Sequence, residues 1–166
     1  MKTAFIIIDV QNILVETGFE TEKIIEKIAY LQDQARKQQI EIIYMQHIET
    51  SEALTSEDWQ LSPLLKRQEN EKVFQKRYNS MFKETGLKEY LDQQGIEQLV
   101  LCGMQTEYCV DTSVKVGFEY GYKLVIPEGA VTTFDGKDIP AETINEFYEG
   151  IWEGRFADVL DYKHIF

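Results

Sequence analysis

Short, continuous apolar runs alternate along the chain with segments whose apolar positions recur at helical spacing. An unbroken apolar run of this kind is typical of a strand that is buried on both faces. Four such runs predict strands at residues 4–9, 40–46, 98–103 and 122–127. Because helical patterns lie between them, the sequence predicts an α/β fold: a doubly wound, three-layer, mostly parallel sheet of about six strands.

The helical segments carry signals for their ends. The first helix is predicted at 21–38, where four apolar residues share one face and Thr21 is available as an N-cap. The next two helices precede the third and fourth strands, and they are predicted to end at Gly95 and Gly121.

Two regions depart from this alternation. Near the end of the chain, a helix is predicted over 139–152 and an edge strand over 156–160. Between the second and third strands, residues 48–83 form a segment too long for a simple connection. Segments of this length usually form lids, arms or site-forming loops.

Length and composition indicate an ordinary globular chain. The 166 residues are 43% hydrophobic and 28% charged, and we expect a single domain over residues 1–166. The net charge of −12 would repel a phosphate backbone, so a nucleic-acid partner is not expected. The longest apolar run at the N-terminus stops at Asp9, which is too early for a membrane span or a signal sequence. Two unpaired cysteines fit the cytoplasm, where thiols stay reduced.

Ligands of an open parallel sheet bind beyond the carboxyl ends of its strands. Asp9, Gln46, His47 and the turn at 103–109 follow the predicted strands and are therefore candidates. If Thr106 caps the next helix, Cys109 lies in its first turn, where free N–H groups lower a thiol pKa.

The candidate residues also have structural interpretations. Cys109 is either a nucleophile with a lowered pKa or a small buried side chain, whereas Cys102 lies within a strand and is interpreted as structural. Asp9 is either a general base or a loop cap. Taken by itself, Lys76 is more typical of a solvated surface charge.

Three stretches in the order "IIIDVQN", "VFQKRYNSMF" and "CGMQTEYCVDTSVKVGFEYGYKLVIPEGA" resemble the signatures of the isochorismatase-like hydrolase superfamily, which includes nicotinamidases and N-carbamoylsarcosine amidases. "YMQH" and "WQLSPLL" extend the resemblance over most of residues 4–133. It implies the Rossmann-like fold of that superfamily and a catalytic triad of Asp9, Lys76 and Cys109.

The resemblance implies an amidase-like cysteine hydrolase that cleaves a C–N bond of a small amide through a thioester. Asp9 would move the proton, Lys76 would stabilise the charges, and Cys109 would carry the acyl group. It also implies a cis peptide at Met104–Gln105, which would direct the N–H groups of Gln105 and Cys109 at an oxyanion. A homodimer or higher homo-oligomer is expected, because oligomers are common in the superfamily.

The sequence departs from the metal-binding members. Nicotinamidases of the superfamily carry Asp-x-His after the second strand, where this chain reads "YMQHIET". The only other histidine, His164, lies at the C-terminus, so neither a metal nor another cofactor is expected. Three alternatives stay open: an isochorismatase-type enol-ether hydrolase, a metal-dependent nicotinamidase and a catalytically silent oligomeric binding protein.

A set of polar and aromatic residues near the predicted strand ends could line the pocket. Gln11 would orient a substrate or cap a loop, and the aromatic side chains would form a wall or belong to the core or a dimer contact. The predicted pocket residues are Gln11, Phe19, Gln46, His47, Trp59, Tyr78, Phe82 and Tyr108.

Overall fold

A single parallel sheet runs through the computed structural model, which describes residues 1–166. Its strand order is β3-β2-β1-β4-β5-β7, with β6 paired to β4, and every strand pair is parallel. The strands are β1 (Thr3–Ile8), β2 (Glu41–His47), β3 (Lys72–Lys76), β4 (Gln98–Met104), β5 (Lys123–Pro127), β6 (Val131–Thr132) and β7 (Asp158–Leu160). The predicted α/β class is confirmed, with seven strands rather than about six.

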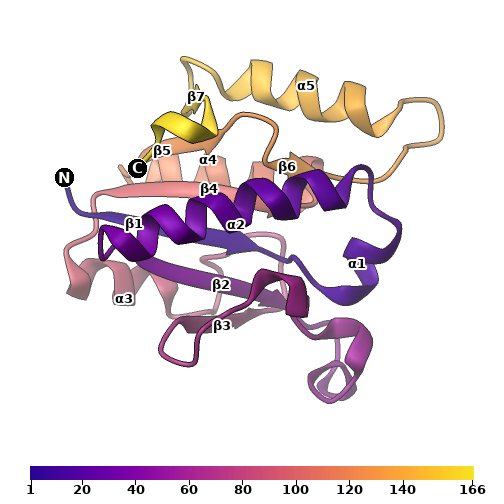
Figure 1. Cartoon of the computed structure of the whole chain (residues 1–166), viewed down its shortest axis with the longest axis horizontal. Coiled ribbons are helices and arrows are strands. Elements are labelled where there is room, and N and C mark those ends of the chain that lie inside the picture. Colours follow the sequence, from indigo (N-terminus) through magenta and orange to yellow (C-terminus); the bar gives the residue numbers. More distant parts are fainter.

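Helices cover both faces of the sheet. In Figure 1, α2 crosses in front of the strands while α3 and α4 lie behind them, and α5 runs along the upper margin beside β5 and β7. The helices are α1 (Asn12–Thr17), α2 (Thr21–Lys37), α3 (Leu87–Gln94), α4 (Asp111–Glu119) and α5 (Ala141–Trp152).

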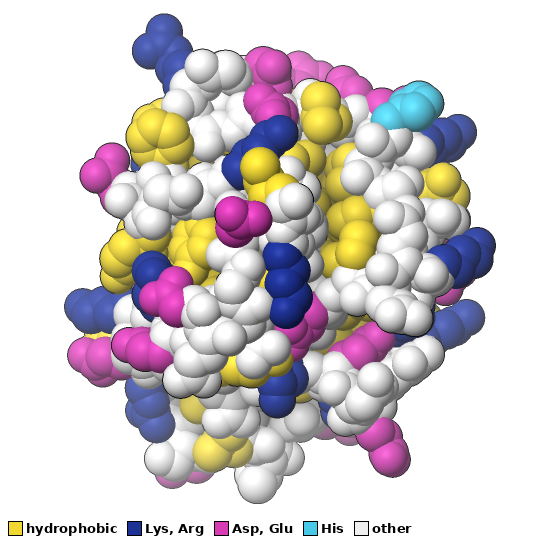
Figure 2. Space-filling model, turned by 90° about the vertical axis from the view of Figure 1, so that its left-hand side faces the viewer, with side chains coloured by type: hydrophobic (Ala, Val, Ile, Leu, Met, Phe, Trp, Pro, Cys, Tyr) yellow, Lys and Arg dark blue, Asp and Glu magenta, His cyan; other side chains and the backbone are white.

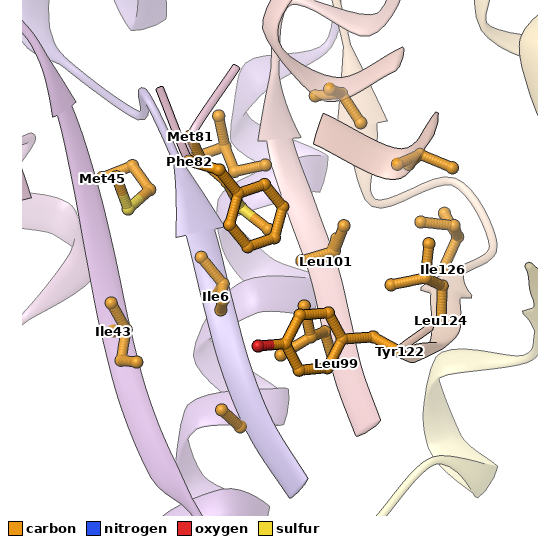
Figure 3. Close-up of a cluster of buried hydrophobic side chains, with 14 of the residues drawn as sticks. Ile6, Ile43, Met45, Met81, Phe82, Leu99, Leu101, Tyr122, Leu124 and Ile126 are labelled. Atoms are coloured by element: carbon orange, nitrogen blue, oxygen red, sulfur yellow. The ribbon is translucent and has the colours of Figure 1, made fainter. Parts of the chain in front are cut away.

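Alternate residues of β1 supply two separate cores. Phe5 and Ile7 pack under α2, whereas Ile6 and Ile8 belong to the larger cluster under α3 and α4. Figure 3 shows side chains of that larger cluster, where Phe82 lies over the sheet. Burial on both faces explains why the central strands are apolar at every position.

Several local predictions need correction. The elements β3, β6 and α1 were not predicted, because each is short and β3 is a largely exposed edge strand without an apolar run. The predicted caps are also wrong. Thr21 donates its hydroxyl to the Val15 carbonyl at 2.8 Å, and Thr106 donates to Asn145 Oδ1 at 2.6 Å, so neither caps its helix.

Gly103 permits the close approach of β4 to β1 beside the carboxyl ends. Its φ is 121°, and a Cβ atom there would overlap the carbonyl oxygen of Ile8. We expect Gly103→Ala to lower the free energy of unfolding by about 3 kcal/mol or more, measured by urea denaturation. The matched control is Gly150→Ala in α5, where nothing lies within 4 Å of the added atom. Equal stability of the two variants would contradict this account.

Charge is mixed on the face formed by the amino ends of the strands. Figure 2 shows this face, where basic and acidic side chains alternate around exposed apolar atoms. It therefore presents no continuous basic surface. Among the helices, none has both the length and the apolar composition required to cross a membrane.

Candidate active site

Three residues from distant parts of the chain meet at the carboxyl edge of the sheet. Asp9 directly follows β1, Lys76 is the last residue of β3, and Cys109 lies in the π-helical turn Thr106–Val110 that follows β4. Lys76 Nζ is 2.7 Å from Asp9 Oδ2 and 3.1 Å from Cys109 Sγ. The parallel strands end at the same edge, which is why segments so far apart in sequence converge.

The two oxygens of Asp9 have different surroundings. Oδ2 pairs with Lys76, whereas Oδ1 is buried and has no hydrogen-bond partner. Asp9 has a φ of 52°, a left-handed backbone conformation that is uncommon for non-glycine residues, although aspartate adopts it more readily than most. The free oxygen lies on the same side chain as the ion pair and is available to accept a proton.

Lys76 is surrounded by acceptors. Besides Asp9 and Cys109, its Nζ lies 3.1 Å from His47 Nδ1 and 3.1 Å from the Tyr78 carbonyl. An ammonium has three N–H donors and no lone pair, so His47 Nδ1 must accept and the imidazole proton is on Nε2. Burial and the neighbouring ammonium both lower the pKa of His47, which keeps the ring neutral.

The resting sulfur is a thiol. Burial and the nearby Asp9 carboxylate raise the pKa of Cys109 to about 12, although Lys76 opposes the shift. Burial also raises the pKa of Asp9 above its ordinary value, against the effect of Lys76. Of the two interpretations of Cys109, the one in which the helix turn lowers its pKa does not describe the resting thiol. The sulfur must lose its proton during the attack, and Asp9 is the adjacent base.

A cavity of about 160 Å³ opens onto the sulfur. Six of its lining residues were predicted for the site: Asp9 and Cys109 from the triad, together with His47, Trp59, Gln105 and Tyr108. The remaining three, Leu14, Glu49 and Asn79, were not predicted. Glu49 lies two residues beyond β2, so the rule of strand carboxyl ends would have found it.

Two predicted pocket glutamines are structural. The Gln11 amide donates to the carbonyls of His47 and Trp59, and its oxygen accepts from the His47 N–H at 2.9 Å. Gln46 is buried and donates to the Trp59 carbonyl at 3.0 Å. Both side chains fix the loop that carries Trp59, and neither lines the cavity.

Three predicted aromatic pocket residues also lie elsewhere. Phe19 borders a groove between α2 and α5, Tyr78 is exposed with Lys83 4.0 Å from its ring centre, and Phe82 is buried in the core. Figure 3 shows Phe82 among the apolar side chains of the sheet. These aromatic residues therefore have different surroundings, which residue type alone does not predict.

The predicted cis peptide is present between Met104 and Gln105. Met104 is buried, with 1% of its surface exposed, and does not line the cavity, whereas Gln105 does. The Gln105 N–H donates no hydrogen bond within the protein. Gln105 and Cys109 both line the cavity, so this N–H is a candidate donor to a bound group.

The donors around Lys76 do not fit a metal ion. Ligand atoms of Asp9, His47 and Cys109 lie within 4.8 Å of one another, as a metal site would require. The Lys76 ammonium is within 3.1 Å of all three, so a metal cation would have to displace a buried positive charge. We therefore assign these donors to the ammonium, and His164 lies exposed beside Asp161.

A family model described as the isochorismatase domain matches residues 3–161 of this chain. The chain belongs to the isochorismatase family. An isochorismatase from Pseudomonas putida KT2440 superposes with a TM-score of 0.90 at 30% identity, covering 98% of this chain and 89% of that one. The superfamily resemblance is thus confirmed, and the protein is an isochorismatase-family hydrolase.

Of two relatives of this isochorismatase-family chain, one has a name that states an activity and the other does not. The uncharacterized isochorismatase family protein YddQ of Bacillus subtilis is 27% identical over 172 residues, and the match covers 96% of each chain. Streptothricin hydrolase of Streptomyces noursei is 28% identical over 144 residues, which cover 83% of this chain and 51% of that relative.

The two cysteines of this isochorismatase-family chain are expected to differ in reactivity. Cys109 opens onto the cavity beside Lys76, whereas Cys102 is fully buried and burial raises its pKa well above the ordinary value. We expect iodoacetamide at pH 7.5 to label Cys109 at least about tenfold faster than Cys102. Peptide mass spectrometry measures both rates. Lys76→Ala should reduce the difference, because the ammonium no longer stabilises the Cys109 thiolate. Equal slow labelling in the unmodified protein would indicate an inert thiol.

Proposed function

We propose that the protein is a cysteine hydrolase that cleaves an amide-type C–N bond of a small molecule through a thioester. One observation carries this proposal: the Lys76 ammonium lies 2.7 Å from Asp9 and 3.1 Å from Cys109, and both of these partners line a small cavity. A nucleophile, a base with a free oxygen and a charge stabiliser are the groups that acyl transfer requires.

Acylation begins when the sulfur of Cys109 attacks the amide carbonyl carbon. The thiol proton passes to Asp9 Oδ1, the C–S bond forms, and the carbonyl electrons move to oxygen. The free Gln105 N–H is the donor we assign to this oxyanion. Collapse breaks the C–N bond while Asp9 returns the proton to the departing nitrogen, which leaves as ammonia or an amine.

Deacylation uses the same groups in the opposite sense. Asp9 accepts a proton from a water molecule whose oxygen attacks the thioester carbon, and the C–S bond breaks. The sulfur leaves as a thiolate that the Lys76 ammonium stabilises at 3.1 Å until Asp9 returns the proton. The products are a carboxylic acid and the restored thiol.

The family context agrees with hydrolysis and leaves the bond open. The relative from Streptomyces noursei is named for hydrolysing streptothricin, whereas the family is named for isochorismatase. An attacking sulfur and an adjacent proton carrier suit acyl transfer, because a thioester requires both. We therefore propose the amide reaction for this chain.

The test is a mass measurement on the intact protein during turnover. A panel of small primary amides is supplied, ammonia release is recorded, and rapid acid quenching traps the adduct. We expect a mass increase equal to the acyl group on the peptide that contains Cys109, and none on the peptide that contains Cys102 after proteolysis.

Variants separate the possible outcomes. Cys102→Ala should keep the rate of ammonia release, whereas Cys109→Ala should lose both release and adduct. Undiminished ammonia release by Cys109→Ala would rule out the thioester route. Pyruvate release from isochorismate without any amide turnover would instead identify an enol-ether hydrolase.

A further inference from the structure

The outer wall of the cavity is aromatic and acidic. Tyr108 is 54% exposed, Trp59 is partly buried with its ring centre 6.1 Å from that of His47, and Glu49 is exposed beside them. Glu49 is near enough to His47 to raise its pKa, although burial prevails and the net shift is downward. A carboxylate and two aromatic side chains around one opening form an environment that favours a cation.

No positive charge in the cavity is free to meet an anion. Neither lysine nor arginine is among the lining residues, and two of the lining residues, Asp9 and Glu49, are acidic. Lys76 is the nearest cation, but its side chain is fully buried and already faces Asp9, His47 and Cys109. A carboxylate on the substrate would therefore lose its hydration without gaining a partner.

We propose that the substrate is a small amide that carries a positive charge, such as an ammonium, on the side that faces away from Cys109. This inference rests on the proposed amide hydrolysis and names its substrate class. The reacting amide occupies the inner end, against Cys109 and Gln105. The cation lies at the outer end, against Glu49 and the rings of Trp59 and Tyr108.

The charge of the whole chain acts in the same direction. With a net charge of −12, the protein attracts cationic ligands over a distance set by the ionic strength. Local recognition and long-range attraction are separable, because only the second depends on acids outside the cavity. A variant that changes one distant carboxylate therefore serves as a control.

The experiment compares two amides of the same shape that differ in charge. Betaine amide carries a trimethylammonium group, and 3,3-dimethylbutanamide carries a tert-butyl group in its place. Each is tested for its ability to protect Cys109 from iodoacetamide at pH 7.5, a binding measurement that needs no turnover. We expect the cation to protect at a concentration at least about fivefold lower than the neutral isostere. Malonamate, the anionic probe, should protect least.

Glu49→Gln should reduce the preference for the cation to less than about twofold. The matched control is Glu119→Gln, which changes an exposed acid on α4 outside the cavity. This control should leave the preference for the cation unchanged. Equal protection by the two isosteres, or best protection by malonamate, would overturn the inference. Ammonia release identifies a separate failure: if no amide is hydrolysed but the cation still protects best, the proposed reaction is wrong and the charge preference stands.

Discussion

Asp9→Asn is expected to lower kcat/KM for the hydrolysed amide by about 10²–10⁴-fold, the usual contribution of a positioned acid–base group. Asparagine keeps the shape of the side chain and can still accept from Lys76 at the Oδ2 position. It cannot take the thiol proton, which the carboxylate is positioned to accept at its unpartnered Oδ1. Steady-state kinetics measures the loss.

The pH profile distinguishes a base from a structural residue. Burial raises the pKa of Asp9, so kcat/KM of the unmodified protein should fall as the pH drops through a value above 3.8, where Asp9 becomes protonated. In Asp9→Asn this acid limb should disappear. The residual activity should instead rise with pH, because without the carboxylate the thiol proton must be lost to solvent hydroxide.

Asp138→Asn is the matched control, since Asp138 is exposed and lies outside the cavity. Its kinetics should equal those of the unmodified protein. A loss of less than about tenfold in Asp9→Asn, with the acid limb preserved, would assign the proton transfer to another group.

Lys76→Met is expected to lower the free energy of unfolding at pH 7.5 by about 3–5 kcal/mol, the usual cost of leaving one member of a buried ion pair alone. Both side chains are buried, with 0% of Lys76 and 2% of Asp9 exposed. Methionine fills a similar volume without charge, so the loss of stability measures the cost of leaving the Asp9 carboxylate unpaired. Urea denaturation measures it.

The stability that Lys76→Met loses should depend on pH through the protonation of Asp9. Without Lys76, the folded-state pKa of Asp9 rises further above its unfolded value, because burial is the largest cause of its shift and the main opposing charge is gone. A raised folded-state pKa stabilises the protein at low pH, and this contribution is lost as the pH rises through it. The stability deficit of Lys76→Met should therefore be larger at pH 8 than at pH 5.

A double variant completes this test. Asp9→Asn/Lys76→Met removes both charges and should recover most of the stability that Lys76→Met loses. Lys137→Met, at an exposed lysine, is the control for the loss of one positive charge. If the double variant is as unstable as the single variant, the cost comes from packing around Lys76 rather than from Asp9.

The predictability of the fold varied with burial. The central strands β1, β2, β4 and β5 were found from apolar runs because both of their faces are covered. The edge strand β3 escaped notice, since its sequence "KVFQK" mixes charge with apolar residues and its burial is slight. An edge strand has one neighbour and little core to fill, so its composition carries a weak signal.

The pocket was less predictable than the triad positions. Gln11 and Phe82 have the composition of pocket residues, yet one holds the Trp59 loop and the other fills the core. Their different roles depend on which way each side chain points after the long segment is packed. Contacts between residues far apart in sequence determine that direction, and no local pattern encodes it.

The sequence by itself determined the α/β class and, through ordered motifs, the position of three chemically suited side chains: Asp9, Lys76 and Cys109. Only the tertiary structure decided the charge state of the sulfur. A thiol early in a helix was expected to ionise easily, but burial beside Asp9 raises the pKa of Cys109 to about 12. Desolvation depends on the whole packed surroundings of an atom, which become defined only when the distant strands and loops come together.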